Sequence, residues 1–378
     1  MKRSSSFAMV SLISVVASLA GISVLAQDVS LSTEKRAQFE SSISKFMAAN
    51  SVPGLSAAVV EHGKFVWSEG FGMADLENSV PATTKTLYRL ASVSKPITAA
   101  GAMELSEQGK LDLDAPIQKF CPAFPQKEQP ITTRELLGHL GGIRHYRSNS
   151  QDDPEIGNTK HFDDPIAAGI KFFANDPLVS PPGTHFHYST QGYTLIGCAI
   201  EGASNEKYVA FMRDHVFIPA GMSHTLADDQ YAVIPNRTRF YSKNKSGTVV
   251  NADFLDSSYK IPGGGWISSA DDMARFEVAM LNDNLVRRAT RELMWTPLKP
   301  TDGSEDSYGL GWGARNAAGV FEVGHGGGQQ GTSTYILIAP GEGDGVVVLI
   351  NMDEADASAL AHELMKIVLG PPSTAPKN

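Results

Sequence analysis

Strand-like segments lie near both ends of this chain of 378 residues and bracket a middle that is mostly helical. Apart from Ser56, residues 55–60 and 65–67 are apolar or aromatic, and Glu61 to Lys64 join them with a glycine-containing turn, which predicts a β-hairpin. On the C-terminal side, strands are predicted at 309–312, 320–323, 334–338 and 346–350, followed by a helix at 357–369. These segments favour an α/β (α+β) fold, in which one antiparallel sheet from both chain ends is flanked by terminal helices and carries an inserted helical lobe.

Helical periodicity and breaker residues give the expected division of the chain. Apolar residues at helical spacing predict a first helix at 32–49, which ends before Pro53, and a second helix runs from Pro96 to Gly109. We expect one domain over 27–370, and 371–378 is a Pro-containing tail that we expect to be disordered. The sheet lobe then takes about 30–90 and 300–370, and the helical lobe takes about 91–299.

The N-terminal segment has the pattern of a secretory signal. Lys2 and Arg3 are basic, and Phe7 to Ala26 is apolar and small without a charged residue. Cleavage after Ala26 is expected, which makes the mature protein exported, either periplasmic or secreted. An uncleaved membrane anchor is the alternative, because the apolar run approaches the ~20 residues that span a bilayer. A mitochondrial presequence would be richer in arginine.

The charge of the chain bears on its binding partners, and its two cysteines bear on disulfide formation. The chain has 41 acidic and 32 basic residues, so nucleic acid is not an expected partner. Cys121 and Cys198 are the two cysteines, far apart in unlike contexts, and we expect two buried thiols, with a single disulfide as the alternative.

Ser92 and Lys95 form an S-x-x-K motif, in which serine and lysine share one face of a helix. The motif alone is weak, because the same pattern also begins at Ser32, Ser42, Ser204, Ser242 and Ser257. Only Ser92 follows a strand-like run, residues 86–90, and precedes a proline that is tolerated near a helix start. A serine at the positive end of a helix is suited to nucleophilic attack.

Lys95 can act as a base only if its pKa falls from the reference value of ~10.4, through burial or a nearby cation. Tyr188 is a second candidate for proton transfer, and a packed core tyrosine is its alternative reading. A third element is the run from Gly324 to Gly328 with His325 inside it, where glycines allow a substrate backbone to approach closely.

The order and spacing of these three elements resemble those of class C beta-lactamase-like and penicillin-binding serine hydrolases. Further similar segments extend the resemblance to about residues 35–365: 111–114, 131–137, 263–272 and 308–312. Residues 139–146 and 188–193 are most similar to the animal mitochondrial members of that family. The resemblance implies a beta-lactamase/transpeptidase-like fold.

The same resemblance implies roles for individual residues. Ser92 would be the acylated nucleophile, and Lys95 and Tyr188 would be the proton-transfer pair. The backbone N–H groups of Ser92 and Gly328 would hold the oxyanion, and His325 would stand where the family has lysine. Thr190 and Gly327 would contact the substrate.

Two departures bear on the substrate. Thr190 stands where many relatives have asparagine, and His325-Gly326-Gly327 replaces Lys-Thr-Gly. The lost lysine charge removes a partner for a carboxylate, which favours amide or ester hydrolysis of peptidase or esterase type. A true beta-lactamase or a D-alanyl-D-alanine carboxypeptidase is the alternative, and a small molecule or a peptide is the expected substrate. Histidine has a reference pKa of ~6.5, so His325 is expected to make activity titrate near neutrality.

Several other readings are weaker. His185 and His187 have no third ligand in view, so no metal and no cofactor is expected. Lys245 to Gly247 mimics the missing lysine motif but lies in a polar, turn-like run, and we expect a loop there. An α/β-hydrolase is excluded because the chain has no G-x-S-x-G elbow, and the glycine run lacks the lysine of a P-loop. A non-catalytic binding or self-assembling scaffold is the alternative of another class.

Overall fold

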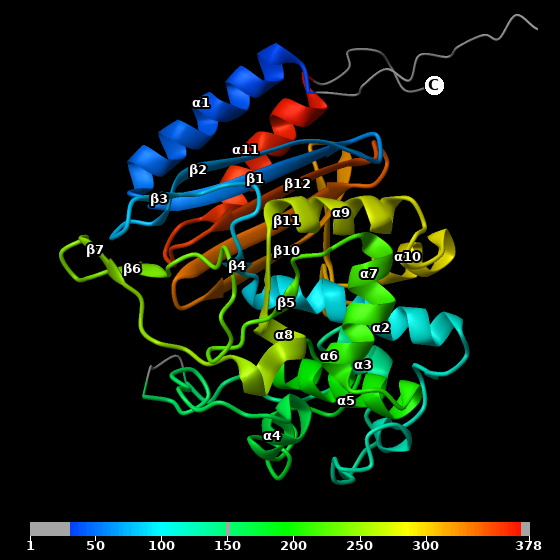
Figure 1. The fold of residues 1–378 in the computed structure, drawn as a ribbon. Helices are drawn as coiled ribbons and strands as arrows, with labels where there is room; N and C mark the ends of the chain where they lie inside the picture. Colours follow the sequence, from blue (N-terminus) through cyan, green and yellow to red (C-terminus); the bar gives the residue numbers. More distant parts are fainter. Residues whose placement is uncertain (1–30, 149–151, 372–378) are drawn as a thin grey trace, which may run out of the picture.

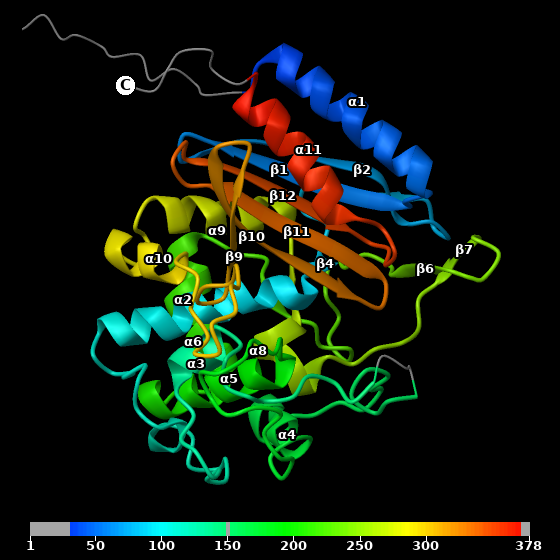
Figure 2. The same ribbon diagram turned by 180° about the vertical axis from the view of Figure 1, so that it is seen from behind.

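The computed structural model describes residues 31–148 and 152–371. The expected signal segment at 1–26 and all but the first residue of the expected tail lie outside the described residues. Seven antiparallel strands form the main sheet, and helices lie on both of its faces (Figures 1 and 2). The predicted sheet, built from both chain ends and flanked by helices, is confirmed.

The main sheet brings distant parts of the chain side by side. In spatial order its strands are β3 (Val80–Pro81), β2 (Lys64–Asp75), β1 (Gly54–Glu61), β12 (Asp344–Ile350), β11 (Thr332–Ala339), β10 (Val320–Gln329) and β9 (Gly313–Ala317). The central pair is β1 and β12, with Leu55 opposite Ile350. Nearly every residue of these two strands is buried, which explains why both read as continuous apolar runs.

Helices cover the two faces of this sheet. The terminal helices α1 (Thr33–Asn50) and α11 (Ala357–Leu369) pack together on one face (Figures 1 and 2). The other face is covered by α9 (Ala270–Leu281), which packs on β1, β2 and β12. A helix from the middle of the chain therefore completes the sheet layer.

The remaining helices gather on the side of α9, away from α1 and α11 (Figure 1). They are α2 (Ser94–Glu107), α3 (Thr133–Leu137), α4 (Pro165–Lys171), α5 (Thr190–Ser204), α6 (Tyr208–Met212), α7 (Ile218–Ala220), α8 (Ile261–Gly264) and α10 (Arg288–Met294). The short turns η1 (Ala91–Val93), η2 (Ile117–Lys119), η3 (Arg213–Phe217) and η4 (Ser258–Lys260) connect them. Among the described residues, no helix combines the length and apolar character needed to cross a membrane.

Two small sheets complete the fold. One has the order β4 (Tyr88–Arg89), β8 (Trp266–Ser268) and β5 (Leu226–Ala227), and the other pairs β6 (Tyr241–Lys243) with β7 (Val249–Asn251). Lys245 to Gly247 lies in the turn between β6 and β7, so the predicted loop is confirmed.

The C-terminal strands differ from prediction in two places. The strand predicted at 309–312 is wrong, because this segment is a bend and β9 begins only at Gly313. Gly311 has a φ of +89°, and a side chain at Gly309 would meet the carbonyl oxygen of Met294 at 2.2 Å. The strand predicted at 320–323 continues through the glycine run to Gln329, because β11 pairs with it along that length.

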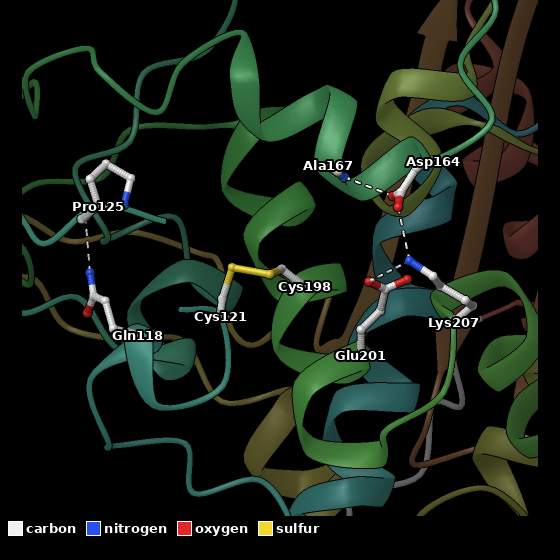
Figure 3. The surroundings of a disulfide bond; sticks show 8 residues. All are labelled: Gln118, Cys121, Pro125, Asp164, Ala167, Cys198, Glu201 and Lys207. Carbon is white, nitrogen blue, oxygen red and sulfur yellow. Dashed lines mark hydrogen bonds and ion pairs between the residues drawn. A yellow bond between two sulfur atoms is a disulfide. The ribbon is translucent and has the colours of Figure 1, made fainter. Parts of the chain in front are cut away.

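Cys121 and Cys198 form a disulfide, so the expectation of two buried thiols is wrong. Cys121 follows η2 and Cys198 lies in α5, and the two Cα atoms are 5.4 Å apart, within the range that a disulfide can bridge. Figure 3 shows the bond joining the loop after η2 to the side of α5. Local sequence could not reveal this pairing, because the two cysteines meet only through tertiary packing.

Candidate active site

Ser92 is held at the junction of β4 and α2, within η1. The preceding residue, Ala91, has a φ of +46°, a left-handed conformation that is unusual for a residue with a side chain. Two threonines of β11 fix this junction, because the Oγ1 atoms of Thr332 and Thr334 each donate 2.9 Å hydrogen bonds to the carbonyls of Arg89 and Leu90. The nucleophile candidate is therefore anchored to the C-terminal part of the sheet.

Lys95 lies one turn into α2, and its side chain is fully buried. Its Nζ atom is 2.9 Å from Oγ of Ser92, 3.2 Å from Oγ1 of Thr190 and 2.8 Å from the carbonyl oxygen of Gly263. In other S-x-x-K matches the lysine points elsewhere: Lys35 pairs with Glu61, and Lys207 with Asp164. Structural context therefore separates Ser92 and Lys95 from these chance matches.

Burial lowers the pKa of Lys95 well below its ordinary value, and the positive charge of Lys260 lowers it further. A deprotonated Lys95 has two N–H bonds and one lone pair. The Gly263 carbonyl can only accept, and Thr190 Oγ1 can accept the second N–H. The lone pair is then left for the hydroxyl proton of Ser92, which is the arrangement a general base requires.

Tyr188 lies just before Ser189, the N-cap residue of α5. Its ring centroid is 4.7 Å from Nζ of Lys95, and its phenol hydrogen-bonds to Ser92. Burial raises the pKa of Tyr188 above its ordinary value, whereas the Ser92 contact lowers it. Tyr188 is therefore a protonated phenol at neutral pH and can donate a proton rather than accept one.

Neutral histidines and tyrosines pack around Tyr188. The ring of His139 is 4.3 Å from the ring of Tyr188 and 4.7 Å from that of Tyr308. Nδ1 of His139 accepts a 3.1 Å hydrogen bond from the backbone N–H of Ser189. Burial lowers the pKa of His139 well below its ordinary value, and the charges of Lys95 and nearby histidines lower it further. This cluster fixes the phenol without adding a charge to it.

His325 lies in β10 and is 7% exposed. Its Nδ1 is 2.6 Å from the carbonyl of Gly326, which can only accept, so Nδ1 carries the proton. Nε2 then accepts from the hydroxyl of Tyr308 at 2.9 Å. Burial, together with the charge of Lys95, lowers the pKa of His325 to about 3. The expected titration of His325 near neutrality, based on its reference pKa, is therefore not what this environment produces.

We expect His325 to remain neutral from pH 8 down to pH 5. Its folded-state pKa of about 3 lies below the unfolded value of ~6.5, so its contribution to stability is present above pH ~6.5 and is lost as the pH falls toward 3. Two-dimensional ¹H–¹⁵N spectra of the imidazoles, with His325→Gln assigning the signal, measure this directly. A titration midpoint of His325 between pH 5.5 and 7.5 would contradict the assigned hydrogen bonds.

The glycines of β10 allow this strand to pass close to the nucleophile. A Cβ atom at Gly327 would lie 2.2 Å from the carbonyl oxygen of Leu90 and 3.1 Å from the backbone nitrogen of Ser92. A Cβ atom at Gly328 would meet nothing within 4 Å, and Gly328 lines a cavity together with Ser92. Gly327 therefore provides close packing, whereas Gly328 faces open space beside Ser92.

The cavity has a volume of about 480 Å³. Its lining includes three predicted site residues, Ser92, Thr190 and Gly328. Its other lining residues include His145, Tyr146, Lys260 and Gly263, to which sequence reasoning assigned no chemistry. His145 and Tyr146 belong to the segment 139–146 that resembles the family, and Lys260 is the lysine of the S-x-x-K match that begins at Ser257.

His185 and His187 are not among the residues that line this cavity. The exposed His185 has its Nδ1 2.9 Å from Oγ1 of Thr184 and its Nε2 3.4 Å from Asp302. Within residues 31–148 and 152–371, no group of three or more histidine, cysteine or acidic residues could hold a metal ion.

This fold, with a serine and a buried lysine beside one cavity, defines the class of beta-lactamase-like serine hydrolases. The chain belongs to the Beta-lactamase family, whose model matches residues 39–368. It is 33% identical over 382 residues to the human "Serine beta-lactamase-like protein LACTB, mitochondrial", covering 77% of this chain and 70% of that protein. It is 28% identical to a penicillin-binding protein of Bacillus subtilis, covering 84% of this chain and 72% of that one. The structure of an octameric penicillin-binding protein homologue from Pyrococcus abyssi superposes with a TM-score of 0.77 at 28% identity, covering 89% of this chain and 77% of that one.

Proposed function

We propose that this protein hydrolyses amide or ester bonds of a small molecule or peptide through an acyl-enzyme on Ser92, as a peptidase or esterase. One observation carries the proposal: Nζ of a fully buried Lys95 lies 2.9 Å from Oγ of Ser92, at the edge of a cavity large enough for a substrate. A deprotonated lysine in that position takes the serine proton as the hydroxyl attacks a carbonyl carbon.

The remaining steps follow from the neighbouring groups. The oxyanion that forms in the attack would be held by the backbone N–H groups of Ser92 and Gly328. The Tyr188 phenol, which keeps its proton at neutral pH, donates that proton to the leaving nitrogen or oxygen, and the carbon–heteroatom bond breaks. The proton held by Lys95 passes back to Tyr188. Water then attacks the acyl carbon and gives a proton to Lys95, the bond from that carbon to Oγ of Ser92 breaks, and the proton on Lys95 returns to Oγ as the carboxylic acid leaves.

The neutral state of His325 favours peptidase or esterase activity over beta-lactamase activity. Both ring nitrogens are engaged, one with Gly326 and the other with Tyr308. His325 therefore offers no positive charge to a carboxylate at the position where relatives have lysine. A beta-lactamase or D-alanyl-D-alanine carboxypeptidase that used this position would need a cation on β10, and β10 carries no lysine or arginine.

Labelling of Ser92 tests the proposed nucleophile. We expect a fluorophosphonate probe or an activated p-nitrophenyl ester to add one acyl or phosphonyl group to the wild type, located on Ser92 by peptide mass spectrometry, and no group to Ser92→Ala. Rates with nitrocefin, p-nitrophenyl esters, D-alanyl peptides and ordinary peptides then rank the substrates. Failure of every such reagent to modify Ser92 would refute the proposal and favour a non-catalytic scaffold, and dominant turnover of nitrocefin would reverse the ranking.

We also propose that the mature chain is exported, into the periplasm or outside the cell. The basic, then apolar pattern of residues 1–26 supports this location. The disulfide between Cys121 and Cys198 supports it as well, because such bonds persist mainly in oxidising compartments.

A further inference from the structure

Lys260 is a buried cation in the wall of the cavity that contains Ser92. It ends η4 and directly precedes α8, whose Gly263 carbonyl accepts the hydrogen bond from Lys95. The residue is 4% exposed and lines the cavity. The short segment 260–263 thus contributes a hydrogen-bond acceptor to Lys95 and a positive charge to the cavity.

The charge of Lys260 lacks a protein counterion. Its Nζ lies 3.3 Å from the hydroxyl of Tyr146 and stands over the rings of Tyr146 and Tyr259, at 5.4 and 5.5 Å from their centroids. In the described part of the chain, no carboxylate forms an ion pair with it. By contrast, Arg89, which is also buried, pairs with Asp228 at 2.8 Å. A buried cation without a partner is costly, and an incoming anion would offset that cost.

Neighbouring groups leave Lys260 as the main positive charge at this wall. Burial lowers the pKa of Lys95 well below its ordinary value, and it lowers the pKa of His145 to about 4, so His145 is neutral at physiological pH. Asp353 and Glu354 also line the cavity. The carboxylate of Asp353 already accepts hydrogen bonds from Oγ of Ser242 and the backbone N–H of Gly331, at 2.7 and 2.9 Å.

We propose that Lys260, with the hydroxyl of Tyr146, binds a carboxylate of the substrate, so that this enzyme prefers acyl compounds that carry a carboxylate near the scissile bond. The inference rests on the proposed function and specifies its substrate class. One ammonium group and one phenol supply the single charge and the two donors that a carboxylate requires, whereas a phosphate dianion calls for more. A bound carboxylate also opposes the effect of Lys260 on Lys95 and makes Lys95 a stronger base when the preferred substrate is present.

Two esters of similar length, p-nitrophenyl valerate and the p-nitrophenyl monoester of glutaric acid, differ chiefly by a carboxylate. Their equilibrium binding is measured by calorimetry on the full chain with Ser92→Ala, which prevents turnover. We expect the glutarate ester to bind about 10-fold or more tightly than the valerate ester, as a charged hydrogen bond predicts. Lys260→Met should abolish this preference, and Lys260→Arg should restore at least part of it. Lys366→Met, on the exposed side of α11, removes the same charge and should leave the preference unchanged.

The outcomes separate the two proposals. If the glutarate ester binds in a way that depends on Lys260, but the wild type turns over neither ester, the acyl-enzyme mechanism is refuted and the carboxylate site is supported. An unchanged preference in Lys260→Met, or no binding of either ester, would overturn the carboxylate site. Lys260→Met is also measured in the active enzyme, which keeps Ser92. An equal fall in kcat/KM for both esters, together with a shifted pH profile, would show that Lys260 acts only through Lys95. That result would also overturn the carboxylate site.

Discussion

Replacement of Lys95 by methionine is expected to lower the rate of Ser92 acylation by about 10²–10⁴, the range that removal of a general base produces. Methionine fills a similar volume, so the change removes mainly the amine that lies 2.9 Å from Oγ of Ser92. Tyr188→Phe should have an effect in the same range, because it removes only the phenol that donates to the leaving group. Stopped-flow release of p-nitroaniline from a peptide anilide under single-turnover conditions measures the acylation step directly, and its nitrogen leaving group needs the proton that Tyr188 donates.

Controls and pH dependence sharpen this prediction. Lys207→Met is a matched control, because Lys207 also belongs to an S-x-x-K match but pairs with Asp164 at 3.0 Å. The pKa of Lys95 lies well below its ordinary value, so the wild-type rate should fall as the pH decreases through that lowered pKa and should reach its plateau at a pH well below that at which an ordinary lysine loses its proton. Unchanged acylation in both Lys95→Met and Tyr188→Phe would refute the assigned roles, and a rate that rises only above pH 9 would show that Lys95 is not deprotonated at neutral pH.

Removal of the disulfide should lower the free energy of unfolding by about 2–5 kcal/mol. The bond joins residues 77 positions apart and ties the loop after η2 to α5 (Figure 3). Because α5 begins at Thr190, which contacts Lys95, loosening of this helix should also reduce acylation. Urea denaturation of Cys121→Ala/Cys198→Ala and of the wild type provides the comparison.

The reduced wild-type protein is the control, because it loses the cross-link without the change in packing that two alanines introduce. Its unfolding midpoint in dithiothreitol should approach that of the double variant, and the variant should not respond to dithiothreitol. Equal midpoints for the oxidised wild type and the variant would show that the cross-link contributes nothing to stability.

Features with a local signal could be predicted from the sequence. The β1–β2 hairpin and the helix at 357–369 follow from hydrophobic periodicity and turn residues, and both lie where we predicted them. The strand-to-helix setting of Ser92 could also be predicted, because Pro96 marks the start of a helix.

Features that arise from tertiary packing could not be predicted. Glu277 carries no local sign of burial, yet it is fully buried in α9 beneath the sheet, which raises its pKa well above the ordinary value. Space for it exists because residue 345 of β12 is glycine, where a Cβ atom would lie 2.4 Å from Oε2 of Glu277. The neutral state of His325 and the unpaired charge of Lys260 depend in the same way on neighbours that are distant in sequence.

The central pairing of β1 with β12 has a consequence for biosynthesis. Leu55 pairs with Ile350, so the edge of β1 stays unpaired in the N-terminal hairpin until β12 has left the ribosome. Such distant pairing makes folding slow and leaves an apolar strand edge exposed to other chains in the meantime. Thr332 and Thr334 anchor the Ser92 junction and belong to the same late segment. A chain that ends before β11 and β12 therefore lacks an assembled Ser92 junction, and the proposed hydrolytic activity requires both strands.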